Sequence, residues 1–176
     1  MALSSCTPIG SIVRDCRDSV GGIIEIKVKV LPNLSTLTSD YTVTSGTVTV
    51  ASNSRTGWYT YYMEKETAMY TEKGATIVAN GGTAYGQELK IIFNKLSAQI
   101  RNELQVLHKN SLQIAVRDAN DTYFLLGYEF GMELTDSSAS TGTAKGDRSG
   151  YELTFTGNER VPKVFLSAAS YNQFGG

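Results

Sequence analysis

Side chains that commonly carry out chemistry are scarce in this sequence. His108 is the only histidine, and nine residues separate the two cysteines, Cys6 and Cys16, in a polar N-terminal segment without CxxC spacing. A Cys16–His108 pair would be the candidate nucleophile, but a histidine near a predicted helix end commonly contacts terminal carbonyl groups instead. These residues also supply too few soft ligands for a tetrahedral metal site. We therefore predict no catalytic residues, no metal and no cofactor.

Motifs that bind phosphate or form acyl intermediates are also missing from the sequence. It contains no Walker-type loop, no GxSxG and no GxGxxG after a strand. The glycine-rich stretches at 81–82 and 142–146 do not open a helix, as a phosphate cradle requires. Glu64 and Glu66 share strand parity, which alternating surface charge explains. An enzyme is therefore the weaker hypothesis.

The charge balance excludes several classes of partner. The chain has 16 basic and 17 acidic residues, a net charge of -1 and a pI near 5.9, whereas proteins that grip phosphates usually show a basic excess. No apolar stretch is long enough to cross a bilayer, so no membrane insertion is expected. Charged side chains interrupt residues 1–22, which argues against a secretion signal and favours two unpaired thiols in a protein made in the cytoplasm.

Length and composition indicate one β-rich domain. A chain of 176 residues can bury a sufficient core without disulfides. Threonine, serine and tyrosine are abundant, with 19, 17 and 10 residues. β-Branched and aromatic side chains suit a pleated, half-buried surface, so the composition favours strands.

Period-two alternation predicts strands along most of the chain. In residues 22–31, Ile24, Ile26, Val28 and Val30 alternate with charged side chains, so we expect these four on the core face. The stripes 89/91/93, 112/114/116 and 151/153/155 are expected to share that core. Further strands are expected at 46–51, 58–71, 85–93, 112–117, 122–135, 151–156 and 161–166.

One helix is expected, over residues 97–108. Ser97 is a good N-cap, and Ile100, Leu104 and Leu107 form an apolar stripe. Asn110 is expected to end the helix in the left-handed conformation.

The remaining segments divide the chain into a domain and its flanks. We expect an N-terminal arm at 1–22, a single domain at 23–166 and a polar C-terminal tail at 167–176. Within the domain, 73–82 is expected to be a loop with a short extended piece, and 136–150 a mobile loop. The fold class is therefore mainly β: an antiparallel sandwich or barrel with one flanking helix.

Three blocks of the sequence carry a resemblance to a known family. They are a strand-to-helix block at 86–107 (GQELKIIFNKLSAQIRNELQVL), a hairpin at 112–127 (LQIAVRDANDTYFLLG) and a loop-to-strand block at 140–156 (STGTAKGDRSGYELTFT), followed by 160–166. Their order, over residues 70–166, resembles the tail tube (major tail) proteins of long-tailed bacteriophages, particularly those from phages and prophages of Bacteroides-type hosts. The G-D-x-x-G-Y pattern at 146–151 is the most specific element.

The resemblance implies a structural virion protein. Such subunits are β-barrels or sandwiches that assemble into stacked hexameric rings, and their merged sheets line a channel. The implied partners are further copies of the chain, the tape-measure protein, other tail proteins and transiently passing DNA. The implied location is the virion tail, after assembly in the host cytoplasm.

Two carboxylates are the candidate channel-lining residues. A strand over 122–135 would place Glu129 and Glu133 on one face and Phe130, Met132 and Leu134 on the other. A DNA conduit should not bind phosphate, so an acidic wall would suit it. A solvated outer face is the alternative interpretation of these residues.

Other functions stay open at this point. A single-ring neck or tail-terminator protein and the tube subunit of a contractile injection system belong to the same class. A carbohydrate-binding sandwich would instead use Trp58, Tyr59, Tyr61 and Tyr62 as stacking platforms. The arm at 2–22, the segment 32–57 and the tail are expected to form contacts between subunits, because they are too polar to fold alone.

Overall fold

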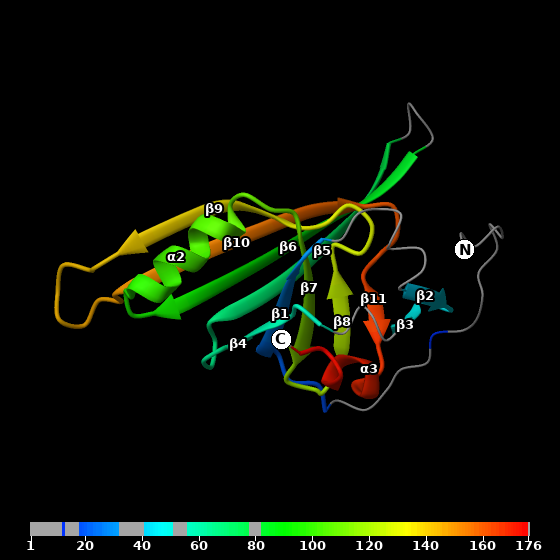
Figure 1. Cartoon of the computed structure of the whole chain (residues 1–176), viewed down its shortest axis with the longest axis horizontal. Helices are drawn as coiled ribbons and strands as arrows, with labels where there is room; N and C mark the ends of the chain where they lie inside the picture. Colours follow the sequence, from blue (N-terminus) through cyan, green and yellow to red (C-terminus); the bar gives the residue numbers. More distant parts are fainter. Residues whose placement is uncertain (1–11, 13–17, 32–40, 51–55, 78–81, 176) are drawn as a thin grey trace.

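The computed structural model describes residues 12, 18–31, 41–50, 56–77 and 82–175. The protein is mainly β, with two sheets packed face to face and a flanking helix (Figure 1), so the predicted fold class is confirmed. Both cysteines and most of the predicted N-terminal arm lie outside the described residues.

Seven strands form the first sheet, sheet A, in the order β2-β3-β11-β8-β7-β1-β4. Among the pairings described, only β3 with β11 is parallel. The strands are β1 (Ile23–Val30), β2 (Tyr41–Thr44), β3 (Thr47–Val50), β4 (Tyr59–Tyr62), β7 (Leu112–Asp118), β8 (Tyr123–Leu126) and β11 (Val164–Leu166).

Four longer strands form the second sheet, sheet B, in the order β5-β6-β10-β9, all antiparallel. They are β5 (Ala68–Ile77), β6 (Gly82–Asn94), β9 (Glu133–Ser140) and β10 (Gly150–Glu159). The far ends of β5 and β6 project beyond the body of the molecule, and β9 and β10 project at the opposite end (Figure 1). Sheet B is therefore longer than the part of sheet A that covers it.

Helix α2 (Ala98–Leu107) begins where the sequence predicts. The Ser97 hydroxyl accepts a hydrogen bond from the Ile100 N–H at 3.2 Å, which satisfies one of the unpaired amides of the first turn. Leu107 is buried, and Ile100 and Leu104 are half-buried. Asn110 does not adopt the expected left-handed conformation; its side chain instead donates to the Val106 carbonyl at 2.8 Å.

The main core lies between the sheets and beneath α2. It contains the predicted stripes of the second half of the chain, together with Ile26, Val28 and Leu107. A second core lies on the other face of sheet A, under the C-terminal helix α3 (Ala168–Asn172). Because both faces of β7 are covered, Leu112 to Val116 are all buried.

The core face of β1 differs from the prediction. A bulge between Ile23 and Glu25 shifts the alternation, so Ile23 is buried and Ile24 is 41% exposed. Val30 is also exposed, at 48%. Two members of the predicted stripe, Ile26 and Val28, are buried as expected.

Two segments expected to be single strands are divided between the sheets. The segment 58–71 forms β4 in sheet A and the start of β5 in sheet B, with a turn at residues 63–67. The segment 122–135 forms β8 and then β9, with a connection at residues 127–132. Gly127 lies in that connection with φ of 65°, and an added Cβ would meet the Leu112 carbonyl oxygen and the Met132 nitrogen at 2.7 Å.

Two other predicted irregular segments are more regular than expected. The predicted loop at 73–82 belongs to the β5–β6 hairpin, as far as it is described. The predicted mobile loop at 136–150 is strand β9 as far as Ser140, and the Asp147 carboxylate then accepts bonds from the Thr143 and Ala144 N–H groups. These bonds hold the pKa of Asp147 below its ordinary value.

The C-terminal segment was predicted as a polar tail, but it packs on sheet A. Tyr171 and Phe174 are 1% and 3% exposed, and the Phe174 ring stacks on Trp58 at 4.2 Å. The buried ammonium of Lys27 donates to the carbonyl oxygens of Tyr171 and Phe174, at 3.2 and 3.0 Å. Two apolar side chains three residues apart, Tyr171 and Phe174, therefore hold this otherwise polar segment against sheet A.

Candidate functional site

The uncovered side of sheet B is the most extensive candidate surface. Along each strand, side chains alternate between the core and this side, which we call the outer face. Strand pairing aligns its side chains in rows, and none of them is buried. The rows are Lys73–Asn158, Thr71–Glu88–Thr156–Glu133, Met69–Lys90–Thr154–Asp136 and Ile92–Glu152–Ser138.

Charges on the outer face are only partly neutralised. Glu88 lies 3.3 Å from Lys90, and Glu152 lies 2.9 Å from Arg148. Within the described part of the chain, Glu133 and Asp136 on β9 have no cationic partner, and Lys73 on β5 has no anionic one. The unpaired charges therefore lie on the two outermost strands, with opposite signs.

Both outermost strands of sheet B have an open edge. Among the strands that the structure describes, β5 pairs only with β6 and β9 pairs only with β10. Each open edge presents backbone N–H and C=O groups that can accept another strand. An open edge of eight or ten residues is long for a soluble domain.

The predicted channel-lining pair is separated by the break between β8 and β9. Glu133 is exposed and belongs to the outer face. Glu129 lies in the β8–β9 connection, where its carboxylate accepts a bond from Arg160 Nε at 2.9 Å. The two carboxylates do not lie on one strand face, because the chain changes sheets between them.

A buried carboxylate fixes that connection. Glu159 is 2% exposed and accepts three backbone N–H bonds of 2.9–3.2 Å, from Glu129, Phe130 and Gly131. Burial raises the pKa of Glu159 above its ordinary value, although the three hydrogen bonds favour its charged form. These bonds replace the β ladder where the chain crosses between sheets, so we assign Glu159 a structural role.

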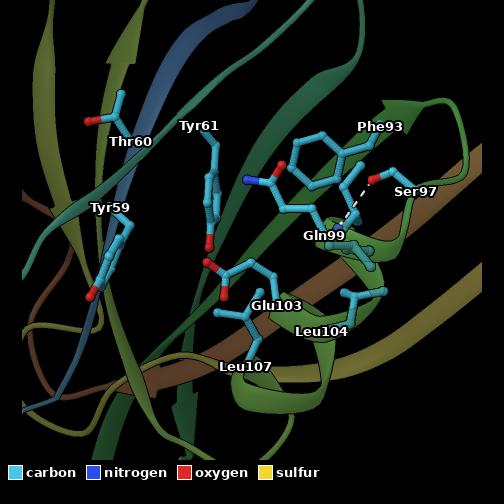
Figure 2. A pocket seen from close by; sticks show the side chains of 11 residues that line it. Tyr59, Thr60, Tyr61, Phe93, Ser97, Gln99, Glu103, Leu104 and Leu107 are labelled. Atoms are coloured by element: carbon cyan, nitrogen blue, oxygen red, sulfur yellow. Dashed lines mark hydrogen bonds between the residues drawn. The ribbon is translucent and has the colours of Figure 1, made fainter.

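A groove of about 360 Å³ separates β4 from α2 (Figure 2). Its floor contains apolar side chains of α2 and sheet B, and its walls carry Tyr59 and Tyr61 on one side and Glu103 on the other. Burial, with the nearby negative charge of Glu103 and Tyr59, raises the pKa of Tyr61 to about 12. No property of the isolated sequence pointed to Glu103, because its proximity to Tyr61 depends on how α2 docks.

The aromatic run at 58–62 does not form one stacking platform. Trp58 is 1% exposed and belongs to the second core, on the opposite face of sheet A from Tyr61. Tyr59 and Tyr62 are exposed, at 62% and 76%. The four rings therefore cannot contact one sugar surface together.

The other candidates from the sequence are dispersed. The ring of His108 bonds to the Ser137 hydroxyl at 2.9 Å, and Cys16 lies outside the described residues. Glu64 accepts a bond from the Asn94 amide, and Glu66 has a positive φ in the turn before β5. Within the described residues, no group of three His, Cys, Asp or Glu side chains could hold a metal ion, and no helix is long and apolar enough to cross a membrane.

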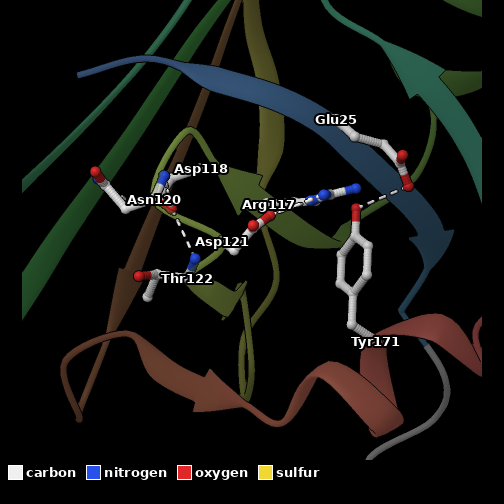
Figure 3. A network of polar contacts seen from close by, with 7 residues as sticks. All are labelled: Glu25, Arg117, Asp118, Asn120, Asp121, Thr122 and Tyr171. Carbon is white, nitrogen blue, oxygen red and sulfur yellow. Dashed lines mark hydrogen bonds and ion pairs between the residues drawn. The ribbon is translucent and has the colours of Figure 1, made fainter. Parts of the chain in front are cut away.

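A polar network at the β7–β8 turn supports the fold rather than a ligand (Figure 3). The Asp118 carboxylate accepts bonds from the N–H groups of Asn120 and Thr122, at 2.9 and 2.7 Å. The Tyr171 hydroxyl donates to Glu25 at 3.1 Å, which ties α3 to β1. The Asp121 carboxylate accepts bonds from Arg117, and the Asn120 amide bonds to Asp118 and to the backbone of Val20, so these groups hold the turn in place.

Fold and surface together define a β-sandwich with an uncovered polar sheet face and open edges. Comparison with known proteins gives no match to a family model, a curated protein or a solved structure.

Proposed function

We propose that this chain is the structural subunit of a phage tail tube, as the sequence resemblance implies. The observation that supports the proposal is sheet B, which has a packed inner face, an unburied polar outer face and two open edges. A subunit that closes a ring through its sheet needs these three properties together, because the ring satisfies both edges and leaves one face toward a lumen.

Strand directions in sheet B suit such a closure. The four strands alternate in direction, so β5 and β9 are antiparallel to each other. When copies are related by rotation about a ring axis, β9 of one copy meets β5 of the next in antiparallel orientation. Every strand of the closed sheet then has two antiparallel neighbours.

The charges on the two edge strands also favour this contact between β9 of one copy and β5 of the next, which we call the junction. Strand β5 carries the unpaired Lys73, and β9 carries the unpaired Glu133 and Asp136, all on the outer face. Opposite charges on adjoining strands stabilise pairing, whereas two copies of one edge would bring like charges together. The charges therefore disfavour edge-to-identical-edge dimers and favour a head-to-tail ring.

The outer face also suits a DNA channel. Besides hydroxyl side chains, Met69, Ile92 and Asn158, its rows carry four carboxylates against Lys73 and Lys90, and Arg148 pairs with one of the carboxylates, Glu152. A wall with this balance repels rather than grips phosphate. Glu133 belongs to the wall, whereas Glu129 lies in the adjacent connection with Arg160. No catalytic residue, metal or cofactor enters the proposal.

Electron microscopy of the purified full chain is the direct test. Stacked hollow tubes are expected, and single rings would instead favour the neck or terminator alternative. A chain that stays monomeric at all concentrations would contradict assembly through sheet B.

A charge exchange tests the junction itself. Lys73→Glu should abolish tubes, because it places three carboxylates at the junction. Combining it with Glu133→Lys and Asp136→Lys should restore them. Lys109→Glu, at an exposed position after α2, is the matched control and should assemble normally. Tubes formed by Lys73→Glu alone would show that β5 and β9 do not meet.

A further inference from the structure

Strand β4 has an open edge beside the groove. It is the last strand of sheet A and, among the described strands, pairs only with β1. The Met63 N–H donates to the Ile24 carbonyl at 2.9 Å, so Met63, Tyr61 and Tyr59 are the residues bonded toward β1. The backbone N–H and C=O groups of Thr60 and Tyr62 therefore point away from β1.

The first position of this edge shows that it can bind an extended segment. The Trp58 N–H, which points in the same outward direction, donates to the Gly175 carbonyl at 3.4 Å. The C-terminal segment thus contacts β4 at its beginning, while the contacts described leave the edge open from Thr60 onward.

Side chains around the groove define the chemistry of what it can hold. Its floor is apolar, with Ile100, Leu107 and Leu153. Within the described residues, Glu103 is the only charged side chain that lines the groove, and no cation lies within ion-pair distance of its carboxylate. Aromatic faces of Tyr59, Tyr61 and Phe93 also line the groove, and aromatic faces attract cations.

We propose that β4 and the groove bind an extended basic segment of a partner protein, which adds a strand to sheet A and inserts a lysine or arginine side chain toward Glu103. Charge complementarity selects the cation, and the outward backbone groups of Thr60 and Tyr62 select the extended conformation. The proposal is independent of ring closure, which uses the edges of the other sheet.

Strand geometry gives the register. The incoming strand forms hydrogen-bonded pairs with Thr60 and Tyr62, so the residue between them lies opposite Tyr61 in a non-hydrogen-bonded pair. Its side chain points to the same face of sheet A as the Tyr61 ring, which is the groove side. The aliphatic part of a lysine there crosses the apolar floor, and its ammonium reaches the Glu103 wall.

A short peptide tests the proposal on the full chain in its solution assembly state. The probe is a blocked, fluorescein-labelled heptapeptide of alternating threonine and valine with a central lysine, followed by fluorescence anisotropy. We expect saturable binding. Peptides with norleucine or glutamate at the centre should bind at least about 10-fold more weakly, because the charge-assisted contact with Glu103 is lost.

Two variants locate the site. Glu103→Gln should weaken binding of the lysine peptide by roughly 10-fold and leave the norleucine peptide unchanged. Thr60→Pro removes an outward N–H without removing a bond to β1, so it should abolish binding of both peptides. Glu66→Gln, at an exposed carboxylate that does not line the groove, is the control and should bind normally. Circular dichroism and the urea midpoint verify that each variant is folded.

Three results would overturn the proposal, two of them obtained with the unmodified protein. Equal affinity for the lysine and norleucine peptides would show that the groove does not select a cation. Absence of saturable binding up to millimolar peptide, or undiminished binding by a folded Thr60→Pro variant, would show that β4 does not accept a strand.

Discussion

Removing the Phe174 ring should destabilise the whole domain, although the residue is the third from the chain end. The ring is 3% exposed, stacks on Trp58 at 4.2 Å with an interplanar angle of 16° and contacts Tyr171. Phe→Ala substitutions in cores cost about 3–5 kcal/mol, and a site beside a helix of only five residues can partly collapse. We therefore expect Phe174→Ala to lower the free energy of unfolding by about 3 kcal/mol.

Urea unfolding measures this loss. With a slope of about 2 kcal/mol per molar urea, the midpoint should fall by about 1.5 M. Trp58 is the only tryptophan, so its emission reports directly on the second core and should shift to the red in the folded variant. Asn172→Ala, on the exposed side of the same helix, is the control. A midpoint shift below about 0.3 M with unchanged emission would refute the packing of α3 on sheet A.

Three further predictions concern the cores and the groove. Because the pKa of Tyr61 is raised to about 12, its contribution to stability should be complete below pH 10 and lost as the pH rises toward 12. The Tyr61→Phe variant should therefore lose less stability over that pH range than the unmodified protein. Glu103→Gln should lower the pKa of Tyr61, measured by a carbon-13 NMR titration. Gly150→Ala should prevent stable folding, measured by circular dichroism, because a Cβ there would clash with the Phe93 carbonyl oxygen. Glu159→Ala should lower the urea-derived stability by about 2–3 kcal/mol through loss of the acceptor for three amides, and Glu159→Gln should lose less.

Local patterns predicted the elements that depend on local physics. Ser97 and the apolar spacing after it were sufficient to place α2, because capping and amphipathicity act within a few residues. Alternation likewise identified Leu89, Ile91, Leu153 and Phe155 as core residues. The residues that alternate with these apolar positions, such as Glu88 and Lys90, form the outer face of sheet B, although the alternation did not indicate which sheet they belong to.

What the sequence did not predict depends on contacts between distant segments. The bulge that buries Ile23 follows from the register of β1 against β7, which alternation cannot show. The break after Gly127 depends on Glu159, some thirty residues later, whose carboxylate replaces the ladder bonds. Similarly, the C-terminal segment was predicted to be a polar tail because Tyr171 and Phe174 are isolated apolar positions. They become core residues only because they pack on the face of sheet A that points away from sheet B.

The position of β1 in sheet A has a consequence for how the chain folds. β1 is the first described strand in the sequence, yet its main neighbour is β7, which is synthesised much later, after all of β5, β6 and α2. The β5–β6 and β7–β8 hairpins can form from adjacent segments, whereas β1 must wait for a partner far along the chain. A nascent chain can therefore pair only one edge of the apolar β1, with β4, until β7 has been made, and the open edge favours aggregation. We expect refolding to be limited by the docking of β1 on β7, with the hairpins already formed.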